Sequence, residues 1–172
     1  DVPLLCSVGV AVFAAGVAPV WAMTPSVPES VEALWEPGKI NVVEFSDFQC
    51  PFCRLMHPAL AEALEPYGDR VHVRRFIIPF HNNADSARAH VCAEQRGQGD
   101  AFADILFELT ESKPEDIAYA VNRLRLDPDD FGRCISDPET QRQVEDNVAL
   151  FKSTGSRGLP TVFIGRTRIV GF

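Results

Sequence analysis

The stretch Phe45-Ser46-Asp47-Phe48-Gln49-Cys50-Pro51-Phe52-Cys53 decides how this chain folds. An apolar run at 40–45 precedes it and a helical pattern at 55–64 follows, so we expect a strand to pass into a helix at Cys50. Unpaired N–H groups and the helix dipole favour an anion at such a point. A cysteine there can have its pKa lowered from about 8.5 to roughly 3.5–7.5, and the thiolate is the form that attacks disulfides. The spacing therefore predicts a redox-active dithiol.

The same two cysteines could instead be half of a zinc site. Structural zinc takes four ligands, and sites built from CxxC pairs usually repeat the pair. No second CxxC occurs in the sequence, because Cys92 and Cys134 stand alone, and His57 would be only a third ligand. We therefore expect a dithiol that works with no metal and no cofactor.

Length and composition allow one folded domain and argue against one class of partner. The chain has 172 residues, of which 46% are hydrophobic, enough for a full core. Its formal net charge is −8, and no block of lysine and arginine occurs. Nucleic-acid binding needs a basic face, so we expect no nucleic-acid partner.

Residues 4–22 contain no charged side chain. Their number is close to the ~20 apolar residues that span a bilayer. We favour a transmembrane anchor, or the last span of a larger membrane domain, over a signal peptide, because no basic residue precedes the run. Either interpretation predicts an extracytoplasmic, membrane-associated domain in a compartment where disulfides persist.

The order of the remaining segments predicts an α/β fold with a helical insertion. A strand, the Cys50 helix and a second strand form a βαβ unit, helices alone follow it, and two short strands, over 158–164 and 167–170, end the chain. Asp127-Pro128 and Asp137-Pro138 each mark the start of a helix. The expected parts are a membrane or signal segment (1–22), a linker (23–38), the first half of the α/β fold (39–83), the helical insertion (84–154) and the second half (155–172).

This order, together with Cys50-Pro51-Phe52-Cys53 and Gly158-Leu159-Pro160-Thr161 before a hairpin, resembles the thioredoxin fold in its DsbA-like form over roughly residues 35–172. The resemblance implies a thiol–disulfide oxidoreductase, in which Cys50 would attack and Cys53 would resolve. It also implies a cis peptide bond before Pro160, beside the dithiol. Glu44, six residues before Cys50, matches a buried acid that assists proton transfer in that family.

Other residues near the dithiol are expected to bind the substrate or to tune the dithiol. Phe48, Phe52 and Leu159 would form an apolar rim for an extended peptide. His57, one turn after Cys53, would either tune the dithiol electrostatically or be an ordinary, partly exposed helix histidine.

The resemblance favours a disulfide-forming oxidase of cysteine-containing proteins, re-oxidised by a quinone-linked membrane partner. A disulfide reductase or isomerase, a glutathione-dependent enzyme and a non-catalytic peptide-binding domain are the alternatives. The apolar start followed by a proline-rich stretch also resembles proteins that fuse a vitamin K epoxide reductase-like domain to a DsbA-like domain. In such a fusion the redox partner would lie on the same parent chain.

Two further cysteines, Cys92 and Cys134, lie in the helical block. In an oxidising compartment they could form a structural disulfide. They could equally be two small buried hydrophobic residues. The residues leave these two alternatives open.

Overall fold

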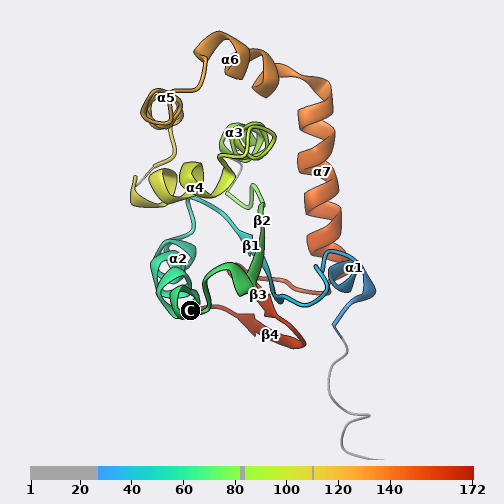
Figure 1. Ribbon diagram of the computed structural model, residues 1–172. Coiled ribbons are helices and arrows are strands. Elements are labelled where there is room, and N and C mark those ends of the chain that lie inside the picture. Colours follow the sequence, from blue (N-terminus) through green and yellow to red (C-terminus); the bar gives the residue numbers. More distant parts are fainter. Residues whose placement is uncertain (1–26, 82–83, 110) are drawn as a thin grey trace, which may run out of the picture.

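A four-stranded sheet forms the centre of the computed structural model, which describes residues 27–81, 84–109 and 111–172 (Figure 1). The strand order is β2-β1-β3-β4. β1 pairs with β2 in parallel and with β3 antiparallel, and β3 and β4 form an antiparallel hairpin. The strands are β1 (Ile40–Ser46), β2 (Val71–Ile77), β3 (Thr161–Ile164) and β4 (Thr167–Val170).

Helices cover the sheet from both sides. Figure 1 shows α2 on one side and α7 with the short α1 on the other, while α3 to α6 form the upper part of the molecule. Side chains of Asp127 and Asp137 cap α6 and α7, as the sequence predicts. The helices are α1 (Glu29–Glu32), α2 (Pro51–Leu64), the 3₁₀ segment η2 (Glu65–Arg70), α3 (Ala84–Glu94), α4 (Gly99–Glu108), α5 (Pro114–Arg123), α6 (Pro128–Ser136) and α7 (Pro138–Ser153).

Alternation along β1 divides the core between the two faces of the sheet. Val42 packs toward Met56 of α2 on one face. Phe45 lies on the other face, where its ring centroid is 5.4 Å from that of Phe76 and 5.5 Å from that of Phe151 on α7. A third cluster fills the helical insertion and reaches Cys53. The dithiol thus lies where the sheet core and the insertion core meet.

Two local features differ from the sequence expectation. The stretch 27–38, expected to be a linker, contains α1, because Val27 and Val31 are one turn apart and bury together against the sheet. The strand expected from Gly158 begins only at Thr161. Pro160 has no N–H to donate to a sheet ladder, so the residues before Thr161 form a bend.

The expected membrane or signal segment, residues 1–22, lies outside the described residues. Among the residues that the structure describes, no helix is both long enough and apolar enough to cross a bilayer.

Candidate functional site

Cys50 is the N-cap residue of α2, because β1 ends four residues earlier and Pro51 occupies the first helical position. Its Sγ atom accepts a hydrogen bond from the backbone N–H of Cys53 at 3.3 Å. The Sγ atom also lies 3.8 Å from the backbone oxygen of Leu159. The peptide bond between Leu159 and Pro160 is cis. The two sequence motifs, 109 residues apart, therefore meet at one sulfur atom.

Cys53 is the second free thiol and has no exposed surface. Burial raises the pKa of the Cys53 thiol well above its ordinary value, and the neighbouring Cys50 raises it further. The Ser46 hydroxyl and the backbone of Asp47 act in the opposite direction. Cys53 is thus held as a protonated thiol, so its use in chemistry requires a proton acceptor.

Asp47 holds the turn that leads into the dithiol helix. Its Oδ1 accepts from the N–H of Gln49 at 2.9 Å, and its Oδ2 accepts from the N–H of His81 at 3.0 Å. The His81 ring also lies on this carboxylate, with Nδ1 2.9 Å from Oδ2. The backbone oxygen of Asp47 accepts from the N–H of Cys50 at 3.0 Å. Sequence reasoning did not single out Asp47 or His81, although a charged residue inside the decisive stretch was a usable signal for Asp47.

Glu44 is fully buried in β1, where the resemblance expects a buried acid. Its register partner on β2 is Arg75, whose Nε donates to Glu44 Oε2 at 2.8 Å. Arg75 also donates through Nη1 to Asp100 Oδ1 at 2.6 Å. The sequence did not identify Arg75 and Asp100, because neither strand register nor contact with the insertion can be read from local pattern.

Phe48 does not belong to a substrate rim, which corrects the sequence expectation. Its side chain is fully buried. Its ring centroid lies 4.8 Å from that of Phe107 on α4 and 6.0 Å from that of His90 on α3. The physical reason is that the turn after β1 points Phe48 into the core of the helical insertion. Phe48 therefore joins the sheet to that core instead of facing solvent.

Apolar side chains do surround the dithiol at the surface. Phe52 is 53% exposed, and Leu55, one turn later on α2, is also exposed. Leu159 is half-buried and packs against two of the core clusters. Phe80 is exposed on the loop that also contains His81. Of the three residues expected at the rim, Phe52 and Leu159 thus retain accessible surface.

His57 lies on α2, one turn after Cys53, and is largely buried. Its Nε2 is 2.8 Å from Asp104 Oδ1 on α4, and its ring stacks on Phe107 at a centroid distance of 4.4 Å. The partly exposed position expected as one alternative is therefore wrong, because His57 is only 8% exposed. The insertion covers this histidine because α4 packs along α2.

A buried histidine makes stability depend on pH. Burial lowers the pKa of His90 to about 3, and the charge of Arg75 acts in the same direction. In the unfolded chain the ordinary pKa is about 6.5. Between the two pKa values, the unfolded state therefore binds a proton on His90 that the folded state does not bind. The contribution of His90 to the free energy of unfolding is therefore most favourable above pH 6.5. It falls by about 1.4 kcal/mol per pH unit as pH decreases toward 3.

Urea unfolding of wild type and a His90→Gln variant at pH 7 and pH 4.5 would measure this contribution. The variant should lose less stability on acidification than the wild type. A His72→Gln variant is the control, since His72 lies half-exposed on β2. Equal losses in the wild type and the His90 variant would contradict the assignment.

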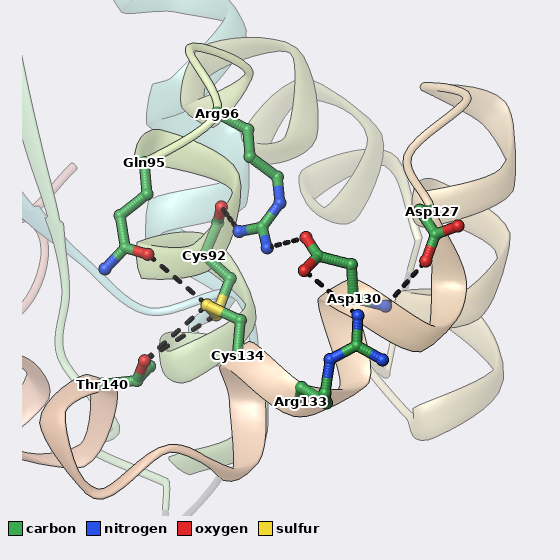
Figure 2. Close-up of polar contacts among 8 residues, drawn as sticks. All are labelled: Cys92, Gln95, Arg96, Asp127, Asp130, Arg133, Cys134 and Thr140. Atoms are coloured by element: carbon green, nitrogen blue, oxygen red, sulfur yellow. Dashed lines mark hydrogen bonds and ion pairs between the residues drawn. A yellow bond between two sulfur atoms is a disulfide. The ribbon is translucent and has the colours of Figure 1, made fainter.

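Cys92 on α3 and Cys134 on α6 form a disulfide, shown in Figure 2. Cys92 is fully buried, whereas Cys134 is half-buried. An ion pair between Arg96, in the turn after α3, and Asp130 of α6 lies beside the disulfide. The disulfide lies in the helical insertion and is separate from the free thiols Cys50 and Cys53.

A metal site would need several donors in one place. In the part of the chain that the structure describes, no group of three or more histidine, cysteine or acidic side chains is arranged to hold a metal ion.

Comparison with known proteins places most of the chain in one family model. A model described as thioredoxin matches residues 37–171. A thioredoxin-like oxidoreductase from Silicibacter pomeroyi DSS-3 superimposes with a TM-score of 0.68 at 25% identity, covering 78% of this chain and 79% of that one. These matches confirm the predicted thioredoxin-like α/β fold with its inserted helices.

Two other solved structures show the same fold at lower identity. A periplasmic thioredoxin-like protein from Salmonella enterica serovar Typhimurium has a TM-score of 0.67 and 23% identity, covering 78% of each chain. The oxidoreductase DsbA from Xylella fastidiosa has a TM-score of 0.62 and 22% identity, covering 78% of this chain and 77% of that one.

Curated relatives are much longer proteins. The Na⁺/H⁺ antiporter NhaA 3 of Salinispora tropica is 29% identical over 134 residues, which is 75% of this chain and 20% of the antiporter. The Na⁺/H⁺ antiporter NhaA of Herminiimonas arsenicoxydans is 25% identical over 139 residues, covering 79% of this chain and 22% of that protein. The chain thus spans about a fifth of the length of these relatives. They give no support to the expected vitamin K epoxide reductase fusion.

Proposed function

The chain belongs to the thioredoxin family as a DsbA-like thiol–disulfide oxidoreductase, and from this premise we propose that it forms disulfides in extracytoplasmic proteins through Cys50 and Cys53. One observation supports this assignment above the others. Cys50 Sγ lies at the start of α2, within 3.3 Å of the Cys53 N–H, beside the Leu159 carbonyl and the cis-proline. Cys50 keeps 4% of its surface exposed, which is where we propose that a substrate sulfur approaches, and the N–H donor stabilises the sulfur when it leaves as a thiolate.

The proposed reaction starts from the Cys50–Cys53 disulfide. A substrate thiolate attacks Cys50, a mixed disulfide forms, and Cys53 leaves and takes up a proton. A second substrate thiolate attacks the substrate sulfur, which releases the substrate disulfide and leaves Cys50 as a thiolate. Two electrons thus pass from the substrate dithiol to the enzyme. Glu44 is the proposed buried group that exchanges a proton with Cys53.

Whether the chain forms or reduces disulfides is proposed from the compartment, which the second cysteine pair indicates. The Cys92–Cys134 disulfide is favoured in an oxidising compartment, where a dithiol tends to be kept in its disulfide form. The periplasmic description of the Salmonella structure supports the same location. A membrane partner that re-oxidises the dithiol, quinone-linked in the sequence prediction, stays a prediction.

The reduction potential of the Cys50–Cys53 pair tests the direction. Equilibration with glutathione buffers should yield a value near about −120 mV, as for a strong oxidant. A value near about −270 mV would instead identify a thioredoxin-like reductant. Parallel refolding of a reduced, disulfide-containing protein would show whether the oxidised chain donates its disulfide.

The exposed aromatic beside Cys50 is proposed to bind apolar residues of the substrate. Replacing Phe52 with alanine should raise KM for a reduced peptide by about tenfold with little change in kcat, because contact area is lost without touching the sulfur atoms. Tyr119→Ala is the matched control, since Tyr119 on α5 is also an aromatic residue with 53% exposure. A kcat loss without a KM change would contradict a binding role.

The antiporter relatives support a second proposal about context. The region of those proteins that matches this chain accounts for about a fifth of their length. We propose that this domain works beside a sodium–proton antiporter at the extracytoplasmic membrane surface. The Cys50 thiolate of a Cys53→Ser variant should attack disulfides of its partner proteins, displace one thiolate from each and remain joined to the other sulfur as a mixed disulfide. Mass spectrometry of the trapped proteins would identify an antiporter as a substrate, whereas purely soluble substrates would contradict this proposal.

A further inference from the structure

The loop that follows β2 is hydrogen-bonded to the residues that lead into the dithiol helix. β1 and β2 are parallel and end side by side, so the loop after β2 lies against the turn after β1. The N–H of Ile78 donates to the backbone oxygen of Ser46 at 2.8 Å. Further along this loop, the N–H of His81 donates to Oδ2 of Asp47 at 3.0 Å. The loop thus holds the last residue of β1 and the residue after it.

The His81 ring adds a side-chain contact to the same carboxylate. Its Nδ1 atom lies 2.9 Å from Asp47 Oδ2. A carboxylate oxygen accepts hydrogen bonds, so Nδ1 carries the proton and donates. The side chain of Asp47 is 1% exposed, whereas that of His81 is 47% exposed. A half-exposed histidine therefore holds a carboxylate that lies inside the protein.

Asp47 contacts the dithiol through its main chain. Its backbone oxygen accepts from the N–H of Cys50 at 3.0 Å. Its backbone also lowers the pKa of the Cys53 thiol, which is the direction expected of an N–H donor that favours the thiolate. A shift of the main chain at Asp47 would therefore change the surroundings of both cysteines.

The partners of the Asp47 carboxylate differ in what they can hold in place. The N–H of Gln49, which donates to Oδ1 at 2.9 Å, belongs to the turn itself and cannot fix that turn to the rest of the protein. The two donors of His81 come from a residue 34 positions further along the chain. The backbone donor is present with any residue except proline at position 81. The ring donor depends on the histidine side chain.

We propose that His81 is a positioning residue for the redox site, which holds Asp47, and with it the turn before Cys50, in the geometry that stabilises the reduced dithiol. The proposal rests on the function proposed above and deepens it. The His81 ring contacts Asp47 and, at a centroid distance of 5.9 Å, the ring of Phe80. Its role is therefore assigned to positioning and not to chemistry at a sulfur atom.

Loss of the ring donor should weaken the thiolate-stabilising contacts of the dithiol. The turn is then held to the loop by backbone hydrogen bonds alone, so the N–H groups that favour a thiolate at Cys50 and Cys53 are less well aligned. A less stable reduced form makes the pair a weaker oxidant.

The reduction potential of the Cys50–Cys53 pair measures this effect independently of turnover. The wild type and His81→Ala are equilibrated with glutathione buffers, and the reduced fraction is measured by mass spectrometry after alkylation. The equilibrium constant for reduction should be about tenfold lower in the variant, because a hydrogen bond to a charged group is lost. For this two-electron couple, tenfold corresponds to a potential about 30 mV more negative.

Two other variants serve as controls. His81→Asn should restore the wild-type potential, because the amide of asparagine carries an N–H on an atom bonded to Cγ, as Nδ1 is in histidine. His72→Ala removes a histidine whose Nδ1 also pairs with a carboxylate, that of Glu36 at 3.1 Å. His72 lies near the start of β2, at the opposite end from the loop, so this variant should keep the wild-type potential.

Amide hydrogen exchange tests the route through Asp47. The N–H groups of Gln49 and Cys50 both donate to Asp47, so both should exchange faster in His81→Ala and at the wild-type rate in His72→Ala. Unchanged exchange at both amides would contradict the proposed route.

The outcomes separate this inference from the proposed function. A wild-type potential in His81→Ala would overturn the role of His81 and leave the function of the dithiol intact. Equal shifts in His81→Ala and His72→Ala, or no recovery in His81→Asn, would also overturn it, since the effect would not come from the Nδ1 donor. Failure of the wild type to form a Cys50–Cys53 disulfide in oxidised glutathione would instead overturn the proposed function.

Discussion

Replacing Cys50 with serine is expected to lower the rate of disulfide exchange with a reduced peptide by at least about a thousandfold. The reason is that Cys50 is the residue of the pair that keeps exposed surface, 4%, whereas Cys53 has 0%. A serine oxygen at the start of α2 cannot form a disulfide with the substrate. The measurement is the rate of peptide oxidation by the chain at pH 7, compared with the uncatalysed rate in the same buffer.

Cys53→Ser is the matched control for this prediction. Mixed with a peptide that contains a disulfide, it keeps the attacking sulfur and lacks only the buried one. Cys50 attacks that disulfide and displaces one peptide thiolate, so one mixed disulfide per chain should form and then persist. The two variants should therefore differ in kind, since Cys50→Ser forms no adduct and Cys53→Ser accumulates it. Adduct formation at Cys53 in the Cys50→Ser chain, seen by mass spectrometry, would reverse the proposed roles.

Cutting the Cys92–Cys134 disulfide is expected to cost about 4 kcal/mol of stability. The two residues are 42 positions apart, so the bond removes much of the freedom of the unfolded chain. For a domain of this size the loss corresponds to a decrease in Tm of about 10 °C. Thermal unfolding of a Cys92→Ala/Cys134→Ala variant measures it, and added reductant should not destabilise that variant further.

The control for this prediction is Cys50→Ala/Cys53→Ala. It also removes two sulfur atoms, but it leaves the Cys92–Cys134 disulfide between α3 and α6 in place, so its Tm should decrease much less. Figure 2 shows a second connection beside the bond, the ion pair between Arg96 in the turn after α3 and Asp130 of α6, so we expect the insertion still to fold without the disulfide. Equal Tm values for both double variants would show that the Cys92–Cys134 disulfide contributes little to stability.

Much of the fold could be predicted from local sequence pattern. The apolar run before Cys50, the proline at the first helical position and the aspartates before Pro128 and Pro138 each fix a boundary through neighbours in sequence. Strand, helix and cap preferences depend on contacts within a few residues, so they are visible in the chain itself. The same holds for the helix N-terminal position of the dithiol.

Contacts between distant segments could not be predicted in this way. Phe48 looked like a rim residue, because its sequence neighbours do not show that α3 and α4 cover it. The bridge from Glu44 through Arg75 to Asp100 depends on the register between β1 and β2 and on where α4 begins.

The sequence by itself determined the dithiol, its place at a strand–helix junction and the order of elements around it. Only the tertiary structure decided which side chains surround the dithiol, which cysteines pair and which acid reaches the buried arginine. The physical reason is that burial and ion pairing depend on separations in space, set by packing between elements, whereas sequence pattern records only separations along the chain.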